Sequence, residues 1–252
     1  MGKVKVAGLI PARYGSTRLP GKALEAILGK PMIQRVYERC LEAAVLDMLC
    51  VATDDQRIVQ AVEGFGGRAV MTRVDHASGT DRLAEAAETV DAEIIVNIQG
   101  DQPFIDPLMI EEAVQPLLDD DTLEMATLMH AIDKPEDLED TGVVKTVADL
   151  DGNALYFSRS LIPYPQKGLP RCVFEHVGLY VYRRDFLMTL SRLEPTPLEE
   201  IESLEQLRVL EHGYRLRVIE TKCADNAFAG FSVDTREDIE RAEAMLHERG
   251  LD

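Results

Sequence analysis

The chain has 252 residues, in which 45 Asp and Glu outnumber 27 Lys and Arg, so its net charge is -18. This acidity excludes binding of nucleic acid or an anionic membrane through a general basic surface, and an anionic ligand would need a local basic pocket. The first strand begins almost at Met1 without a charged-then-apolar leader, and no apolar run reaches the roughly 18 residues that span a bilayer, so we expect a soluble, cytoplasmic protein.

In the first half of the chain, Val- and Ile-rich segments alternate with segments of helical periodicity. We expect strands at 3–10, 48–53 and 93–99, and helices at 31–44, 55–65, 81–90 and 107–118. Near-continuous apolar strands joined by helices are typical of a mostly parallel sheet covered on both faces. The predicted fold class is therefore α/β, with ligands at the carboxyl ends of the strands.

After about residue 120 this alternation becomes less regular. The segments 124–132, 143–159, 174–187 and 214–222 predict antiparallel or mixed strands separated by irregular loops. The segment Thr235 to Arg249 predicts a closing amphipathic helix with Ile239, Ala242 and Leu246 on its apolar face. We expect one domain, 1–252, in which about 1–130 and 185–252 form the core and about 131–184 form a smaller lobe.

The cysteines give no sign of a disulfide framework or a metal site. They are scattered along the chain and never stand in CxxC spacing, at Cys40, Cys50, Cys172 and Cys223. We expect them to be reduced and structural.

A small basic loop, "PARYGSTRLPGK", directly follows the first apolar strand. It combines two glycines and two hydroxyl side chains with three cations and no acid, at Gly15, Gly21, Ser16, Thr17, Arg13, Arg18 and Lys22. Glycines allow the backbone to approach phosphates closely, and oriented N–H groups form an anion-binding concavity. The loop matches neither the Walker A pattern nor GxGxxG. An ordinary loop with solvated charges is the alternative to a triphosphate site.

Two aspartates are candidates for a metal site. Asp101 follows an apolar strand in "VNIQGDQPFI", and Asp234 ends another in "FSVDTREDIE". Carboxylates at the ligand edge of a sheet suit Mg²⁺, which takes oxygen ligands and keeps substrate phosphates in its shell. Taken alone, Asp101 is equally well explained as a turn residue, and Asp234 is better explained as the N-cap of the last helix.

Further polar residues stand in segments that also have ordinary structural explanations. In "MTRVDHASGTDRLAE", Ser78 or Thr80 could cap a helix. His76 and His176 could be satisfied structural histidines, and a Glu-Gln pair on a helix could be a solvated face. Three later segments also offer a cation and several polar groups, at Arg159, His176, Tyr180, Glu205 and Gln206.

The stretches "IPARYGSTRLPGK" and "GKPMIQRVYERC" resemble the 3-deoxy-D-manno-octulosonate cytidylyltransferases, a family of sugar nucleotidyltransferases, and similar motifs run from Leu9 to Asp238. The resemblance implies a Rossmann-like nucleotidyltransferase fold with a smaller mixed-sheet lobe. It also implies transfer of a cytidylyl group from CTP to 3-deoxy-D-manno-octulosonate (Kdo) with Mg²⁺, for lipopolysaccharide biosynthesis, in a cytoplasmic homodimer.

The same resemblance assigns roles to individual residues. It implies metal binding by Asp101 and Asp234, which with Arg13 and Lys22 form the catalytic set. The implied nucleotide-binding residues are Ala12, Arg13, Ser16, Arg18, Lys22, Arg73, Ser78 and Gln99. The implied sugar-binding residues are Gln99, Arg159, His176, Tyr180, Glu205 and Gln206.

Some alternatives remain open at this point. Gln102 stands in "GDQP" where the family often has Glu, which leaves the choice of sugar open. The same reaction on an 8-amino octulosonate is the nearest alternative, and "RYGS", "VYER" and "GDQP" do not decide between the two sugars. A metal-dependent glycosyltransferase is a more distant alternative, but it would typically show an Asp-x-Asp pair, which "GDQP" lacks. A non-catalytic binding protein would be favoured only if the aspartates were missing. Val181, Phe186 and Leu187 could form a dimer interface or be buried within the subunit.

Overall fold

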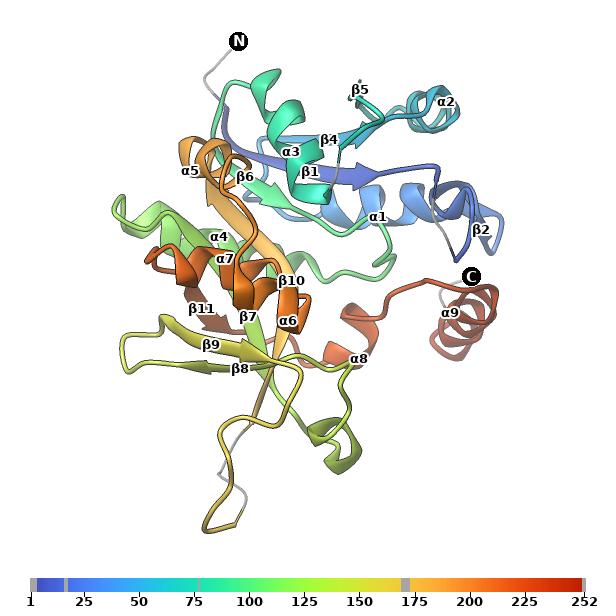
Figure 1. The fold of residues 1–252 in the computed structure, drawn as a ribbon. Coiled ribbons are helices and arrows are strands. Elements are labelled where there is room, and N and C mark those ends of the chain that lie inside the picture. Colours follow the sequence, from blue (N-terminus) through green and yellow to red (C-terminus); the bar gives the residue numbers. More distant parts are fainter. Residues whose placement is uncertain (1–3, 16–17, 77, 169–172, 251–252) are drawn as a thin grey trace. The chain divides into compact units, whose positions relative to one another are not determined.

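A computed structural model describes residues 4–15, 18–76, 78–168 and 173–250 of the chain (Figure 1). The chain divides into two compact units, Met1–Glu111 with Cys223–Asp252, and Glu112–Lys222. The expected lobe at 131–184 falls entirely within the second unit. Ser16, Thr17 and Cys172 lie outside the described residues.

The first unit contains a parallel sheet with the strand order β6-β1-β4-β5. Its strands are β1 (Val4–Ala12), β4 (Met48–Thr53), β5 (Ala69–Met71) and β6 (Ala92–Asn97). Val6 to Ile10 of β1 are all buried, so side chains on both faces of the strand are covered. The predicted α/β class with a mostly parallel sheet is confirmed.

The helices of the first unit match the periodicity of the sequence. Figure 1 shows α1 and α3 packed near the sheet, and α3 contacts β1, β4 and β6. A short hairpin and the last helix enclose a separate apolar cluster, in which Ile239, Ala242 and Leu246 are buried as predicted. The bounds are η1 (Lys22–Leu24), β2 (Ala26–Ile27), β3 (Lys30–Pro31), α1 (Met32–Cys40), α2 (Gln56–Gly64), α3 (Gly79–Glu88), α8 (Asn226–Ala229) and α9 (Arg236–Glu248).

The second unit has a mixed sheet, as the sequence predicts. Strand β7 (Met125–Ala131) pairs antiparallel with β10 (Phe174–Arg183) and parallel with β11 (Arg217–Glu220). Strand β8 (Lys145–Ala148) pairs antiparallel with both β10 and β9 (Ala154–Ser158). The helices are η2 (Pro135–Leu138), α5 (Arg184–Leu190), α6 (Pro197–Glu202) and α7 (Gln206–Glu211), and α4 (Pro107–Asp119) spans the boundary between the units.

One expected strand was wrong in its last four residues. The segment 174–187 is a strand only to Arg183, after which α5 begins. Phe186, Leu187 and Leu190 are buried there at the spacing of a helix face rather than at the alternation of a strand. Val181, Phe186 and Leu187 are therefore interior residues of the second unit, and their apolar character is explained without a dimer interface.

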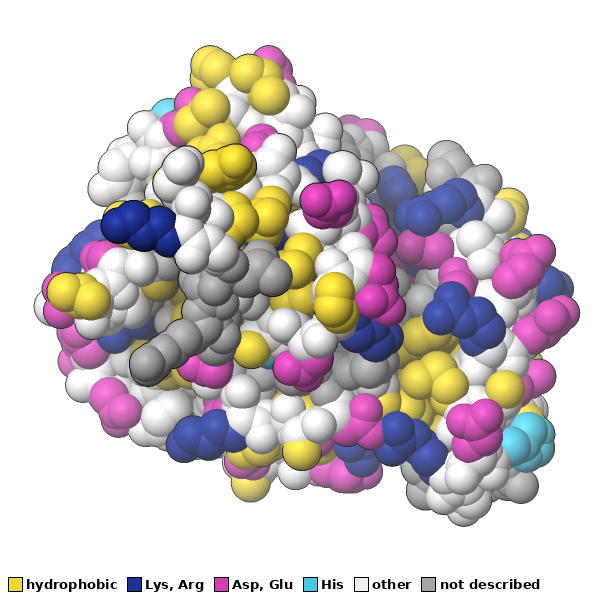
Figure 2. All heavy atoms as spheres, turned by 90° about the horizontal axis from the view of Figure 1, so that it is seen from below, with side chains coloured by type: hydrophobic (Ala, Val, Ile, Leu, Met, Phe, Trp, Pro, Cys, Tyr) yellow, Lys and Arg dark blue, Asp and Glu magenta, His cyan; other side chains and the backbone are white. Residues whose placement is uncertain are grey.

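Three cysteines have the structural character that the sequence predicts. Cys40, Cys50 and Cys223 are free and buried. Burial raises the pKa of Cys50 to about 11, so this thiol stays protonated at neutral pH. Over the described residues, no helix combines the length and the apolar character that crossing a bilayer requires. Figure 2 shows acidic and basic side chains interspersed on one face rather than a continuous basic patch.

Candidate active site

The basic loop turns back sharply before Lys22. Gly21 has a φ of 73°, in the left-handed region that favours glycine, and its N–H donates to Tyr14 O at 2.9 Å. A Cβ atom at Gly21 would lie 3.1 Å from the Tyr14 ring, which closes the loop from the other side. The turn starts η1 at Lys22, so this side chain leaves the loop at a fixed point next to the end of β1.

Asp101 lies close to the end of β1 because the glycine before it has no side chain. A Cβ atom at Gly100 would lie 2.9 Å from Pro11 O, which is closer than Cβ contacts normally allow. The backbone also connects the two predicted carboxylate segments, since Val233 N–H donates to Asp101 O at 2.9 Å. Two segments that are far apart in the sequence therefore meet at the end of the first strand.

Lys22 bridges the two aspartates. Its Nζ lies 2.8 Å from Asp101 Oδ2 and 2.9 Å from Asp234 Oδ1, and Arg18 Nη1 lies 3.0 Å from Asp234 Oδ2. The Lys22 side chain is 16% exposed and the two carboxylates are 29% and 27% exposed. Burial lowers the pKa of Lys22, but the two carboxylates outweigh this effect, so its pKa is raised and the ammonium stays charged.

Asp234 is not the N-cap of the last helix, contrary to the explanation that the isolated sequence favours. Thr235 is the N-cap of α9, its hydroxyl accepts from Asp238 N–H, and Asp238 completes a capping box. The Asp238 carboxylate also accepts from the backbone N–H of Asp234 at 3.1 Å. Because Thr235 caps the helix, the Asp234 carboxylate is left to pair with Lys22 and Arg18.

These groups line a polar hollow with a volume of about 220 Å³. Seven of the predicted site residues line it, and four others were not predicted as site residues. The predicted residues are Ala12, Arg13, Arg18, Lys22, Gln99, Asp101 and Asp234, and the additional ones are Pro11, Ala23, Met32 and Gly100. The close approach of Gly100 to Pro11 is the only one of these additions that the sequence signals, through the glycine before Asp101.

The donor set of the hollow fits Mg²⁺. Two carboxylates converge on one ammonium, and Mg²⁺ is commonly held by one or two carboxylates together with substrate phosphates. Within the described residues, no group of three or more His, Cys, Asp or Glu side chains is arranged to hold a metal ion. The remaining ligands of a cation bound by Asp101 and Asp234 would therefore come from phosphate oxygens or water.

Arg73 and Ser78 are not among the residues that line this hollow. Ser78 caps α3, with its hydroxyl accepting from Asp81 N–H at 3.0 Å. The Arg73 side chain is 70% exposed and lies 3.6 Å from a carboxylate oxygen of Glu85, which also contacts His76. These contacts are the structural explanations that the sequence left open for this segment.

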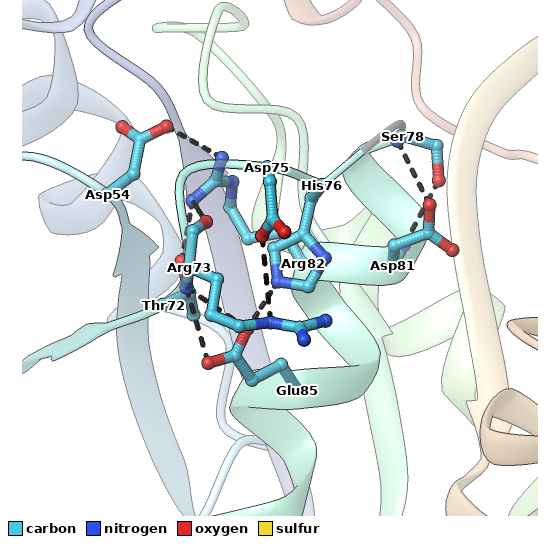
Figure 3. A network of polar contacts seen from close by, with 9 residues as sticks. All are labelled: Asp54, Thr72, Arg73, Asp75, His76, Ser78, Asp81, Arg82 and Glu85. Atoms are coloured by element: carbon cyan, nitrogen blue, oxygen red, sulfur yellow. Dashed lines mark hydrogen bonds and ion pairs between the residues drawn. The ribbon is translucent and has the colours of Figure 1, made fainter.

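Beneath this segment lies a buried ion pair that sequence reasoning missed (Figure 3). Arg82 is 4% exposed, and its Nη2 lies 2.8 Å from Asp54 Oδ2. Its Nη1 also donates to Thr72 Oγ1 and to Arg73 O. The pair fixes the loop after β5 against α3, so the position of Arg73 depends on Arg82. A single arginine in a helix gives no sequence signal of such a role.

Three predicted sugar-site residues lie together in the second unit. The rings of His176 and Tyr180 have centroids 5.4 Å apart, and Tyr180 Oη donates to Gln206 Oε1 at 3.1 Å. His176 Nε2 lies 2.9 Å from Thr127 Oγ1. Burial lowers the pKa of His176 to about 3 and raises the pKa of Tyr180, so both side chains are neutral at neutral pH.

Glu205 lies next to this group at the start of α7, where it is the N-cap residue before Gln206. Glu205, Gln206 and Tyr180 line one small space, together with Tyr182 and Met125. The predicted pair is therefore not a solvated helix face, since Gln206 is 5% exposed. Thr127, on the neighbouring strand, is the contact that sequence reasoning missed, because an isolated threonine in an apolar strand carries no special signal.

Arg159 follows the last residue of β9 and is held by backbone carbonyls. Its Nε donates to Glu202 O at 2.8 Å, its Nη1 to Thr141 O at 2.9 Å and its Nη2 to Ser203 O at 3.4 Å. The Glu202 carboxylate accepts from the Arg159 backbone N–H rather than from the guanidinium. The Arg159 guanidinium is thus held by three backbone carbonyls, with no carboxylate among these partners.

Comparison with known proteins gives a consistent result. Residues 7–220 match the model of the family described as Cytidylyltransferase. Two proteins named 3-deoxy-manno-octulosonate cytidylyltransferase are similar over nearly their whole length. The one from Syntrophotalea carbinolica is 52% identical, covering 98% of this chain and 100% of that protein, and the one from Geobacter metallireducens is 51% identical, covering 96% and 98%.

A solved structure, described as CMP:2-keto-3-deoxy-manno-octonic acid synthetase complexed with CTP, superposes with a TM-score of 0.92. It is 47% identical in sequence and covers 97% of this chain and 99% of that chain. The similarity spans the basic loop, both aspartates and the polar cluster of the second unit. The chain belongs to the cytidylyltransferase family, and within it to the 3-deoxy-manno-octulosonate cytidylyltransferases.

Proposed function

We propose that this enzyme transfers the cytidylyl group of CTP to 3-deoxy-D-manno-octulosonate and releases pyrophosphate. The names of its similar proteins support the substrates. The observation that carries the proposal is the bridge from Lys22 to Asp101 and Asp234 in a hollow that also contains Arg13 and Arg18. Such a hollow offers cations for a triphosphate and carboxylates for a metal ion at one place.

The reaction forms a bond between the anomeric 2-hydroxyl oxygen of the sugar and the α-phosphorus of CTP. The bond between the α-phosphorus and the oxygen bridging to the β-phosphate breaks, its electron pair leaves with pyrophosphate, and the proton of the attacking hydroxyl passes to solvent water. Transfer of this kind requires positioning and charge neutralisation more than covalent participation by the protein. Arg13, Lys22 and Ser16 would bind the phosphates, with Arg18 assisting, and they would stabilise the charge that develops on the leaving pyrophosphate.

Asp101 and Asp234 would hold Mg²⁺. When bound, this ion would lower the pKa of the attacking hydroxyl and polarise the α-phosphate. Lys22 would then exchange its two carboxylate partners for phosphate oxygens, which keep its ammonium neutralised. Because the carboxylates and the phosphates compete for the same ammonium, Lys22 is the residue through which nucleotide and metal binding would be coupled.

The remaining residues of the proposed site would orient the two substrates. Arg159 would recognise the carboxylate of the sugar acid, since a guanidinium matches a carboxylate in geometry. The neutral His176 and Tyr180 would hydrogen-bond sugar hydroxyls. Further proposed contacts are Ala12, Gln99, Arg73 and Ser78 for the nucleotide, and Gln99, Glu205 and Gln206 for the sugar.

We also propose that the enzyme acts as a cytoplasmic homodimer in lipopolysaccharide biosynthesis. The motif resemblance supports this assembly and this role. Burial of thiols such as Cys40 and Cys50 without disulfides fits a reducing compartment. Light scattering of the purified protein at micromolar concentration would test the assembly, and a monomeric mass would overturn it.

A pyrophosphate-release assay tests the proposed reaction. The enzyme is mixed with CTP and Mg²⁺, together with either Kdo or its 8-amino analogue. We expect release with Kdo and the formation of CMP-Kdo, confirmed by mass spectrometry. Preference for the 8-amino sugar would reassign the acceptor, and no release with either sugar would defeat the proposal. Omitting the sugar controls for CTP hydrolysis.

A further inference from the structure

Lys145 is a buried cation that the proposed reaction does not use. It stands in β8 within the apolar run "VVKTVA", and it is fully buried, with 0% exposure. Removing an ammonium from water is costly unless hydrogen bonds replace the lost solvation. The buried Lys145 ammonium must therefore have partners that compensate for this cost.

The partners of the Lys145 ammonium are backbone carbonyl oxygens. Its Nζ donates to Asp140 O at 2.5 Å, to Val143 O at 2.8 Å and to Arg159 O at 3.4 Å. Asp140 and Val143 lie on either side of Thr141, so these two bonds fix the turn that contains Thr141. The third bond connects that turn to the end of β9.

Thr141 in turn contacts the guanidinium of Arg159. Its carbonyl oxygen accepts from Arg159 Nη1 at 2.9 Å. Lys145 thus holds the turn, and the turn presents the carbonyl of Thr141, which holds the Arg159 guanidinium. Lys145 also bonds the Arg159 carbonyl directly, so it fixes both the backbone of Arg159 and one acceptor of its guanidinium.

The guanidinium of Arg159 retains capacity for a ligand. Of its five N–H donors, one each on Nε, Nη1 and Nη2 is directed to a carbonyl, at Glu202, Thr141 and Ser203 respectively. The two N–H groups that remain, one on Nη1 and one on Nη2, can donate to a carboxylate. A guanidinium held in this way loses little further freedom when it binds an anion.

We propose that Lys145 is a positioning residue for the sugar acid, because it fixes the turn and the strand end that orient the Arg159 guanidinium toward the sugar carboxylate. The inference rests on the proposed role of Arg159 in sugar binding. Lys145 itself touches no substrate. Its removal should weaken recognition of the sugar acid while leaving the nucleotide unaffected.

The test is a double-mutant cycle on the full-length enzyme, with Lys145→Met and Arg159→Met. Met is long and apolar, so it fills much of the lysine volume without the ammonium. We expect Lys145→Met to raise the KM for Kdo about tenfold, with the KM for CTP and kcat changed less than about threefold. In the Arg159→Met background, Lys145→Met should raise the KM for Kdo by less than about a further twofold, because both substitutions remove the same interaction.

Lys134→Met is the matched control, since Lys134 is an exposed lysine close to the same turn and has none of these bonds in the structure. If Lys145→Met does not fold, Lys145→Arg is the second variant, because it keeps the positive charge but changes the positions of the hydrogen-bond donors. It should raise the KM for Kdo and leave the KM for CTP unchanged. An equal rise in both KM values, or additive effects in the cycle, would overturn the positioning role. An unchanged KM for Kdo in Arg159→Met would instead defeat the proposed sugar assignment of Arg159.

Discussion

Lys22 in the first unit shares its ammonium between two carboxylates that are 29% and 27% exposed, whereas Lys145 in the second unit is fully buried and donates to backbone carbonyls. The two lysines differ in what can replace their partners. Phosphate oxygens can substitute for the carboxylates around Lys22, because the hollow is open to solvent. The partners of Lys145 are carbonyls of the folded backbone, and its own side chain is fully buried.

This difference separates two uses of charge in one chain. A partly solvated ion pair is easily separated, because water and ligands compensate for the lost contact. A buried ammonium cannot leave its acceptors without a large desolvation cost. We infer that the charges around Lys22 are arranged for exchange with substrate, and that the charge of Lys145 keeps groups in place.

Asp101→Asn should produce the largest effect. It removes one of the two carboxylates in the exchangeable cluster, and the loss of one preorganised metal ligand costs on the order of 3 kcal/mol in the barrier, or a hundredfold or more in rate. The melting temperature should remain close to that of the wild type, because Asp101 is partly exposed. Steady-state pyrophosphate release and thermal unfolding measure both quantities.

Asp91→Asn is the matched control for that prediction, since Asp91 is exposed just before β6 and lies outside the hollow. It should retain the wild-type rate. If Asp101→Asn also turned over at the wild-type rate, the metal assignment would be wrong.

Glu175→Gln tests a partly buried carboxyl group of the second unit. Burial, together with the nearby carboxylate of Asp137, raises the pKa of Glu175 to about 7, although Lys145 opposes the shift. His130 Nε2 lies 3.1 Å from Glu175 Oε2, and the pKa of His130 is lowered by burial. Both side chains are therefore most compatible with this site in their neutral forms.

The sign of the effect follows from the raised pKa. Because the folded state holds the Glu175 proton more tightly than the unfolded state, this carboxyl destabilises the fold as the pH rises from about 4.5 to about 7. Glu175→Gln should raise the free energy of unfolding above that of the wild type by at most about 3 kcal/mol at pH 8, and by nearly nothing at pH 4. Urea unfolding of both proteins at both pH values measures this difference in the free energy of unfolding. A variant that is less stable than the wild type at pH 8 would contradict the prediction.

Lys22→Met should alter two affinities in opposite directions. CTP binding should weaken about tenfold, or about 1.4 kcal/mol, because a phosphate contact is lost. Binding of Mn²⁺ without nucleotide should become tighter, because the ammonium no longer occupies the space between Asp101 and Asp234. Calorimetric titration with CTP and with Mn²⁺ alone measures the two effects separately.

Arg18→Met separates the bridging position of Lys22 from its charge. Arg18 carries the same charge, but it contacts Asp234 from a side chain that is 65% exposed. The substitution Arg18→Met should therefore change the affinity for Mn²⁺ less than Lys22→Met does. Equal effects of the two substitutions would show that only net charge matters.

The sequence predicts the hollow better than it predicts the second unit, for a physical reason. In the hollow, Lys22 and Asp101 follow apolar strands and adjacent glycines, and parallel strands bring such ends to one edge of a sheet. In the second unit, Lys145 acts through carbonyls of residues 140, 143 and 159, and the identity of a residue says nothing about its carbonyl. Only a lysine within the apolar run 143–148 indicates that a cation is enclosed there.

Helix ends show a similar limit of sequence reasoning. Asp234 and Thr235 are both good N-cap residues, so local preference cannot choose between them. The choice depends on the bond from Val233 N–H to Asp101 O, which is a contact between distant segments. The same limit applies to α5, where a strand and a helix share the apolar run around Phe186.

Thr235→Ala should have the smallest effect and separates capping from metal binding. Loss of the N-cap hydroxyl, which accepts from Asp238 N–H at 3.2 Å, should lower the free energy of unfolding by about 1 kcal/mol. Affinity for Mn²⁺ in the presence of CTP should stay within about twofold of the wild type, because the Asp234 carboxylate keeps its position. Asp234→Asn should behave in the opposite way, with metal binding lost and α9 still capped by Thr235. If Thr235→Ala instead abolished metal binding, the two adjacent side chains would not have separate roles, and Asp234 would depend on the cap for its orientation toward Lys22.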